Sequence, residues 1–369
     1  MQRKFETLRF GVNYTPTRNW WYCWNDFDAG AIARDLDAIA DLHADHIRIM
    51  LLWPFFQPNP AAVSTAHLDR LDRLMELAAE RKLDVCATML TGWLSGWAFR
   101  PPYDERDAFY ASTKIREAVE IYFRACAGRL NQHSHFLGFD LGNEINCCWK
   151  AATPDEGDAW MDWLLSLCDE ISPGRVHVNG VDHQPWFSRN TFSPRALARR
   201  PALATIHSWI GFTGALDRGR ALERPCTHLA PAMAALVRAY AGGPDKPVWL
   251  QEFGASNEWM EEAEIVPFLE KAAEAAIRGG ICWLTWWSSH DVDRRFRFDS
   301  LEYDLGLITV GQDIKPAGLA FRRLARAWAG KPVFQSPAPA EAPKILEPAT
   351  TWTWLLETQR QLDALESRL

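Results

Sequence analysis

The sequence predicts an α/β fold, a (β/α)8 TIM barrel with a C-terminal linker and a helical extension. Two observations predict this fold. Short apolar runs alternate with longer segments of helical period over residues 8–330, which is the pattern of repeated βαβ units around a parallel sheet. In addition, two of these apolar runs stop at a glutamate, Glu144 and Glu252, and parallel barrels carry their reactive groups at the carboxyl ends of their strands.

Each predicted strand is a short apolar run bounded by loop residues, as expected for a strand buried in a parallel sheet. The predicted helices keep apolar residues on one face, as Ile32, Leu36 and Ile39 do in the first of them. In chain order, the strands are expected at 9–14, 46–52, 84–90, 136–142, 176–180, 203–209, 247–252 and 281–286. The helices are expected at 29–42, 66–81, 108–130, 157–171, 230–240, 261–279 and 316–328.

We therefore expect residues 1–330 to form the catalytic barrel and residues 331–369 to form a separate extension. Residues 336–340 are rich in proline and predict a stiff connector. Residues 355–369 predict a helix with leucines on one side. Two placements are open for this helix, against its own barrel or at a homodimer interface, and we favour the first.

Composition excludes several function classes. The net charge of −7 and the pI near 5.8 argue against a nucleic-acid partner. No run reaches the ~20 apolar residues that would span a membrane. The first residues contain no apolar leader segment, so we expect a cytoplasmic protein, or a secreted one if a leader has been removed. Cys86, Cys126, Cys168 and Cys282 fall in predicted strands and helices, as reduced, buried thiols do.

The chain contains 19 tryptophans, and many of them stand where predicted strands end. Sugars stack their C–H faces on indole rings, so this distribution favours a carbohydrate site. The alternative is that the indoles pack loops or interfaces. Near strand ends we take Trp53, Trp93 and Trp149 as candidates for substrate contact.

The residues at the predicted strand ends suit a neutral polyol substrate. They comprise two carboxylic acids, an arginine, a histidine, amides and indoles. The first predicted strand carries no H-x-H metal motif and no glycine-rich phosphate loop is present, so we expect neither a metal nor a cofactor. The set is Asn13, Arg48, Asn143, Glu144, His207, Trp209, Glu252 and Trp286.

This set resembles the retaining glycoside hydrolases of clan A, most nearly glycoside hydrolase family 5, the cellulase and mannanase family. The resemblance covers residues 8–330. It implies that Glu144, preceded by Asn143 at the end of strand four, is the acid/base, and that Glu252 at the end of strand seven is the nucleophile. It also implies that Arg48 lies beside the nucleophile, that His207 belongs to a strand-six motif, and that Trp286 lies under the sugar in subsite −1.

Two positions depart from the family pattern. Trp209 occupies the place of the tyrosine that usually donates a hydrogen bond to the nucleophile. An indole donates one hydrogen bond but has no hydroxyl group. The second departure is at the end of strand three, where the usual histidine is absent. We therefore expect a divergent branch of the family.

The expected function is a retaining β-glycosidase acting on gluco- or manno-configured oligosaccharides or glycosides by double displacement. Burial raises the pKa of a carboxyl group and a nearby cation lowers it, so Glu144 suits the acid/base role and Glu252, near Arg48, suits the nucleophile. Asn143 is expected to bind the sugar 2-hydroxyl, and bulky loops favour exo action. Two alternatives remain: a transglycosylase using the same site, and a non-catalytic carbohydrate-binding barrel. Both glutamates could also be structural acids.

Overall fold

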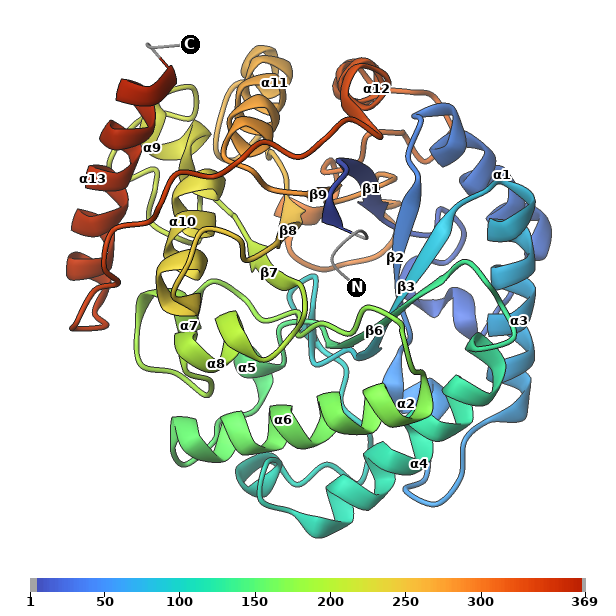
Figure 1. Cartoon of the computed structure of the whole chain (residues 1–369). Coiled ribbons are helices and arrows are strands. Elements are labelled where there is room, and N and C mark those ends of the chain that lie inside the picture. The colour runs from blue at the N-terminus through green and yellow to red at the C-terminus, as the bar shows by residue number, and fades with distance from the viewer. Residues whose placement is uncertain (1–4, 367–369) are drawn as a thin grey trace.

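Seven parallel strands form one curled sheet in the computed structural model, which describes residues 5–366 and side chains as far as Leu362 (Figure 1). The strands are β1 (Arg9–Asn13), β2 (His46–Met50), β3 (Asp84–Leu90), β6 (Phe136–Gly142), β7 (Ala204–His207), β8 (Val248–Phe253) and β9 (Trp283–Trp286). Their order across the sheet is β6-β3-β2-β1-β9-β8-β7. The predictions for residues 1–4 and 367–369, including the end of the last predicted helix, lie outside the described residues.

The segment predicted as the fifth strand, residues 176–180, closes the gap between β6 and β7 without forming a regular strand. On the β6 side the Val178 amide donates to the Phe139 carbonyl at 2.9 Å. On the β7 side the contact uses a side chain, because the Thr205 hydroxyl donates to the Asn179 carbonyl at 2.6 Å. The Gly180 amide donates to the buried Asp140 carboxylate at 2.7 Å. The backbone ladder is therefore kept toward β6, whereas a side chain replaces it toward β7.

Helices cover the outside of the sheet (Figure 1). Several begin where a Ser, Thr or Asp side chain accepts a hydrogen bond from the first turn. Ser112 does so for Ile115 at 3.2 Å, which is why the helix predicted from residue 108 starts only at Thr113. The large helices are α1 (Ala29–Asp41), α3 (Thr65–Glu80), α4 (Thr113–Leu130), α6 (Pro154–Ile171), α8 (Pro194–Arg199), α10 (Leu229–Ala241), α11 (Glu262–Arg278) and α12 (Pro316–Trp328).

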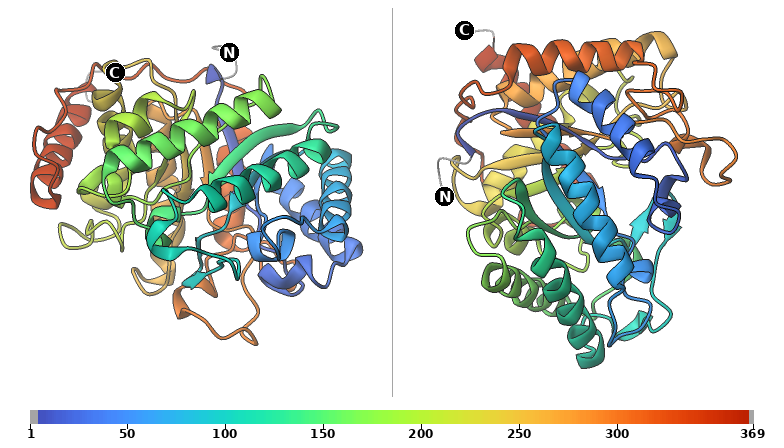
Figure 2. Two further views of the ribbon diagram at one scale, coloured as in Figure 1. Left: turned by 90° about the horizontal axis from the view of Figure 1, so that it is seen from below. Right: turned by 90° about the vertical axis from the view of Figure 1, so that its right-hand side faces the viewer.

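Short elements lie in the connecting loops. They are η2 (Trp20–Trp24), α2 (Trp53–Phe56), η3 (Arg106–Ala108), α5 (Ile145–Cys148), α7 (Gln184–Phe187), α9 (Arg224–Thr227), η4 (Ser300–Glu302) and the antiparallel hairpin β4 (Trp93–Leu94) and β5 (Trp97–Ala98). Figure 2 shows this hairpin and the long loop after β9 on the face of the molecule opposite the two chain ends. This face collects the carboxyl ends of the strands.

The C-terminal helix α13 (Pro348–Glu366) begins seven residues before its predicted start, residue 355, and lies beside α10 (Figure 1). Trp352 is buried, and its indole N–H donates to the Thr213 carbonyl at 2.8 Å. Thr351 is also buried, with its hydroxyl 3.4 Å from the Phe187 carbonyl. A homodimer contact through this helix, and a domain boundary at residue 330, stay predictions.

The register of the sheet places future site residues side by side. Asn13 on β1 pairs with Arg48 on β2, and His207 on β7 pairs with Glu252 on β8. Because parallel strands in register present their ends at the same edge, these four side chains converge. Among the described helices, none is both long enough and apolar enough to cross a bilayer.

Candidate active site

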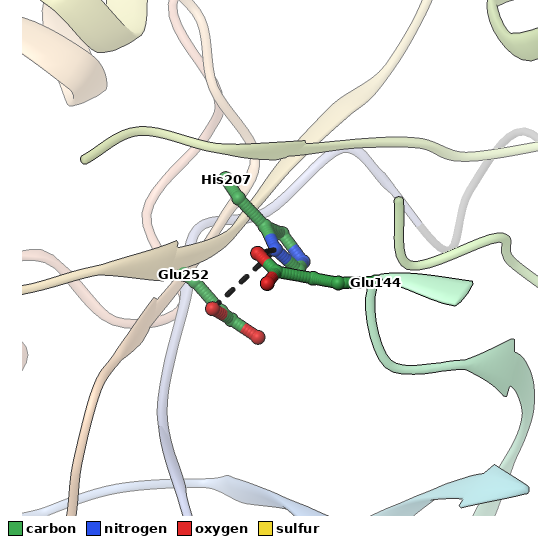
Figure 3. A group of neighbouring side chains, drawn as sticks. All are labelled: Glu144, His207 and Glu252. Carbon is green, nitrogen blue, oxygen red and sulfur yellow. Dashed lines mark hydrogen bonds and ion pairs between the residues drawn. The ribbon is translucent and has the colours of Figure 1, made fainter. Parts of the chain in front are cut away.

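Glu144 and Glu252 bring two carboxyl groups together at the carboxyl edge of the sheet, with His207 between them (Figure 3). Glu144 directly precedes α5, and Glu252 is the penultimate residue of β8. Oxygens of both carboxyl groups and a ring nitrogen of His207 all lie within 4.8 Å of one another. Retaining glycoside hydrolases hold their two carboxyl groups about 5–5.5 Å apart, whereas inverting enzymes hold them about 6.5–9.5 Å apart. The spacing fits the retaining class.

His207 connects the two acids. Its Nδ1 lies 2.8 Å from Glu144 Oε1 and 3.4 Å from Glu252 Oε2. Its Nε2 lies 3.0 Å from Gln251 Oε1, and the Gln251 amide nitrogen in turn donates to Asp140 at 3.2 Å. Gln251 therefore presents its oxygen to the ring, so Nε2 carries a hydrogen, and the remaining proton is shared between Nδ1 and Glu144. Burial would lower the pKa of His207, but the two glutamates raise it overall.

Glu252 accepts hydrogen bonds on both of its oxygens. The buried Arg48 guanidinium lies 2.7 Å from Oε1, and the Trp209 indole N–H lies 3.2 Å from Oε2. Arg48 is held by three further acceptors, Asp140, Asn13 and Asn143. These donors fix the position of the Glu252 carboxyl group at the wall of the cavity.

Trp209 supplies the donor that the sequence left open at the tyrosine position. Its ring approaches Glu252 closely because the next residue after β8 is a glycine: a Cβ at Gly254 would lie 2.8 Å from the Trp209 ring. The indole N–H can donate but not accept. Trp209 can therefore hold the carboxylate but cannot exchange a proton with it.

Glu144 has the opposite environment. Burial, together with the charges of Glu252 and Asp182, raises its pKa to about 7, although His207 opposes this increase. Its backbone lies in the left-handed region at φ 47°, which is rare for a residue with a side chain. The Glu144 amide donates to the Gly180 carbonyl at 2.7 Å, which fixes this turn. Two carboxylic acids in different environments are what separate acid and nucleophile roles require.

A cavity of about 470 Å³ opens above this pair. Asn143, Glu144 and Glu252 form part of its wall. Four aromatic side chains also line it: Trp93, Trp209, Phe212 and Trp287. A concave site with convergent polar groups and aromatic walls suits a small polar ligand with apolar faces, such as a short sugar.

The fold as a whole matches solved glycoside hydrolases. A GH5_18 protein from Streptomyces cattleya, solved with GlcNAc, is 32% identical, covering 98% of this chain and 92% of that one, with a TM-score of 0.88. A GH5_18 protein from Bifidobacterium longum subsp. infantis is 31% identical over 89% of this chain and 81% of that one, with a TM-score of 0.85. The chain belongs to glycoside hydrolase family 5.

This membership confirms the resemblance inferred from the sequence and makes the protein a glycoside hydrolase of clan A. An exo-β-1,4-mannosidase from an Opitutaceae bacterium is 25% identical, covering 88% of this chain and 60% of that one, with a TM-score of 0.77. Comparisons with protein-family models and with curated proteins gave no match.

In this family 5 enzyme, the strand-end tryptophan that lines the cavity is Trp287, and the expectation for Trp286 is corrected. Trp286 is buried, and its indole N–H donates to the Leu305 carbonyl at 3.1 Å. Trp287 lines the cavity, and its N–H donates to Glu302 at 3.1 Å. Neighbouring residues of a strand point to opposite sides, so a shift of one position exchanges a wall residue for a packing residue.

The expectation that Trp53 and Trp149 contact the substrate is also corrected. Both side chains are fully buried outside the cavity lining. Trp53 donates to Gln57 at 2.8 Å. Trp149 stacks on Phe109, with ring centroids 4.2 Å apart. Both indoles therefore pack the loops beneath the site. Trp93, in contrast, lines the cavity and is 38% exposed.

Asn13 and Arg48 lie one layer below the cavity. Both are fully buried and neither lines it. The Asn13 amide nitrogen donates to the Gln251 and Trp286 carbonyls at 3.0 and 3.3 Å, and its oxygen accepts from Arg48 at 3.0 Å. These residues hold Glu252 in place, so direct contact with the substrate is not expected from either of them.

Sequence reasoning missed several polar residues of the site, among them the following four. Asp140 is a buried acid inside an otherwise apolar strand, and that contrast was its only signal. The cavity is also lined by Lys150, Asp182 and Glu302, which lie in segments that connect strands and helices. In such segments no periodic sequence pattern predicts the direction of a side chain. Among the described residues, Glu144, His207 and Glu252 also form the one cluster dense enough for a metal ion. The Arg48 cation 2.7 Å from Glu252 opposes a second cation there.

Proposed function

We propose that this family 5 enzyme is a retaining exo-β-mannosidase that removes one terminal mannosyl residue from β1-4-linked disaccharides or short oligosaccharides. The observation that carries the mechanism is the pair of carboxyl groups within 4.8 Å, one raised in pKa and one held by Arg48. The proposed identity of the sugar is supported by the similarity to a GH5_18 variant from Streptomyces cattleya that was solved with Manβ1-4GlcNAc and is 32% identical to this chain.

The two glutamates take different roles. Glu252 attacks the anomeric carbon while Glu144 gives its proton to the departing oxygen, which forms a covalent glycosyl-enzyme and releases the leaving sugar. Glu144, now ionised, takes a proton from water, and the resulting oxygen nucleophile attacks the anomeric carbon and restores Glu252. Two inversions at this carbon retain its configuration. His207, hydrogen-bonded to Glu144 at 2.8 Å, stabilises that residue in its ionised state.

Asn143 is placed to bind the reacting sugar. Its oxygen accepts from Arg48 at 2.7 Å, and one amide hydrogen goes to the Trp93 carbonyl at 2.6 Å. The amide group is thereby fixed at the cavity wall beside Glu144. Its second amide hydrogen supplies a donor for the sugar 2-hydroxyl, a hydrogen bond that strengthens in the transition state.

Exo action is supported by contacts that close one side of the cavity. The hydroxyl of Ser95, in the turn of the β4–β5 hairpin, donates to Glu302 in the loop after β9 at 3.1 Å. Gly96 of the same turn faces the Asp299 side chain, and a Cβ there would lie in ordinary van der Waals contact with it, at 3.4 Å. A polymer passing through the site would have to separate these two loops, whereas a terminal sugar would not.

The function is tested by incubating the enzyme with Manβ1-4GlcNAc, β1-4-mannotetraose, and matched aryl β-mannoside and β-glucoside. Proton NMR should show β-mannose as the first product, with mannose released one unit at a time from the tetraose. Glu252→Gly should abolish turnover, and Glu144→Ala should reduce it about 10²–10⁴-fold for poor leaving groups. Asp304→Asn, a change at an exposed ion pair with Arg294, is the matched control and should stay active.

Three outcomes contradict the proposal: α-mannose as the first product, preference for the glucoside, or full activity of Glu252→Gly. Cleavage of the tetraose into disaccharides would overturn exo action alone. A run with excess sugar acceptor separates hydrolysis from transglycosylation, because transfer would give a new glycoside in place of free mannose.

A further inference from the structure

A third carboxylic acid, Glu302, lines the cavity outside the catalytic pair. It ends η4, in the loop between β9 and α12. Its Oε2 accepts two hydrogen bonds, from the Trp287 indole N–H and from the Ser95 hydroxyl, both at 3.1 Å. No side chain or amide among the described residues donates to its Oε1. The carboxyl group is therefore fixed through one oxygen, and the other is left for a donor that enters the cavity.

Glu302 lies on the nucleophile's side of the cavity. Trp287, which orients it, follows β9, the strand that pairs with β8 and its Glu252. Burial raises the pKa of Glu302 to about 7, and the charge of Glu252 adds more to this increase than that of Asp299 does. Asp182, in contrast, is the loop acid whose charge acts on Glu144. Each catalytic glutamate thus has its own neighbouring acid, on a different loop.

We propose that Glu302 is a specificity-determining residue that binds hydroxyl groups on the edge of the non-reducing sugar remote from the bond being cleaved. Oε1 of Glu302 has no donor among the described residues, and a sugar hydroxyl that enters the cavity can donate a hydrogen bond to it. A carboxylate forms stronger hydrogen bonds than a neutral acceptor. The inference rests on the proposed function, since it assumes that the sugar on the nucleophile's side is the one transferred.

The same contact explains how a terminal sugar would be distinguished from an internal one. A free hydroxyl has a hydrogen to donate to Glu302, whereas an oxygen that carries another sugar has none. The added sugar would also meet the β4–β5 turn, which Ser95 ties to Glu302. Ser95 and Gly96 both have left-handed backbones, with φ 51° and 79°, so this turn is tightly folded against the loop. Glu302 therefore selects the terminal sugar of an oligosaccharide both by hydrogen bonding and by steric exclusion.

The test compares aryl β-mannoside with its 3-, 4- and 6-deoxy analogues for the wild type, Glu302→Ala and Glu302→Gln. We expect the wild type to disfavour at least one deoxy analogue about 10- to 100-fold in kcat/KM, the loss typical of one charge-assisted hydrogen bond. Glu302→Ala should lower kcat/KM on the parent glycoside by a similar factor and should remove that discrimination. If Glu302→Ala does not fold, Glu302→Gln keeps the volume and a neutral acceptor but removes the charge, so it should weaken the discrimination.

Asp304→Asn, in the same loop and outside the cavity lining, is the control and should keep the wild-type pattern. A residue with a purely structural role would lower activity on all glycosides equally and leave the discrimination intact. Discrimination within twofold of wild type in a folded Glu302 variant overturns the proposal. If the wild type cleaves no β-mannoside, the proposed function fails instead, so the two failures are distinguishable.

Discussion

The indole nitrogen of Trp209 lies 3.2 Å from Oε2 of Glu252, and it is one of two donors that hold this carboxylate. The other donor, Arg48, contacts the opposite oxygen at 2.7 Å. Family 5 enzymes usually place a tyrosine hydroxyl where Trp209 stands, so the hydrogen bond is preserved although the chemical group has changed.

Trp209→Phe removes the donor and keeps an aromatic ring. We expect kcat/KM to fall about 10- to 100-fold, because one hydrogen bond to a charged group is lost in the reaction. The formation of the glycosyl-enzyme, measured as a burst with an activated aryl glycoside, should slow most. Phe212→Leu, at the neighbouring exposed wall position, is the control and should affect KM more than kcat. An unchanged burst rate in Trp209→Phe would mean that Arg48 alone aligns Glu252.

The pH dependence should report the acid/base residue. With a pKa of about 7, Glu144 must be protonated in the free enzyme for the first step, so kcat/KM should decline about tenfold per pH unit above that value. Below it, Glu144 is protonated and adds no further pH dependence. Because the pKa of Glu302 is also about 7, the profile of Glu302→Gln is needed. Because the ionised carboxyl group of Glu302 is the better acceptor, its protonation should lower kcat/KM on the acid side, and only that acid-side decline should be lost in Glu302→Gln.

Two neighbouring tryptophans should respond differently to the same substitution. Trp287→Phe removes a cavity wall and a donor to Glu302, so we expect KM to rise at least about tenfold. Trp286→Phe alters a buried side chain that contacts the Leu305 carbonyl, so it should lower the melting temperature and leave KM within about twofold. Calorimetry and steady-state kinetics on both variants check this, and the reverse pattern would restore Trp286 as the sugar contact.

The contribution of the C-terminal helix to stability can be measured through Trp352. This side chain is 2% exposed and donates to the Thr213 carbonyl, so Trp352→Ala should cost about 3–5 kcal/mol of unfolding free energy. Trp354→Ala, at a partly exposed position on the same helix, should cost clearly less. Chemical denaturation gives both values. Equal losses would show that α13 is held by something other than the Trp352 contact.

The sequence was informative wherever a local pattern encodes burial. The apolar runs before Glu144 and Glu252 end at one edge of the sheet, so counting strands was enough to pair the two acids. The segment at 176–180 was harder, because Asp140 and Thr205 take hydrogen-bond positions that a regular strand would use. That substitution depends on tertiary contacts, which an apolar run does not reveal.

The walls of the cavity were the least predictable part. Asp182 lies in a loop, and Glu302 ends the short helix η4. The direction of the Asp182 side chain depends on a contact with Asn146, and that of Glu302 on contacts with Ser95 and Trp287. The tryptophan count did indicate an aromatic site. It could not separate Trp93, which lines the cavity, from indoles such as Trp149 that pack beneath it, because both kinds follow strand ends.

The left-handed backbone of Glu144, at φ 47°, implies that activity and stability compete at this position. Glycine adopts that conformation freely, whereas for a residue with a Cβ it costs roughly 1–2 kcal/mol of conformational free energy. Selection for stability alone would therefore replace the proposed catalytic acid. Glu144→Gly should melt at a higher temperature than Glu144→Ala, and both should be inactive on poor leaving groups. The same melting temperature for both would show that the turn is unstrained and that the position of Glu144 does not reduce the stability of the fold.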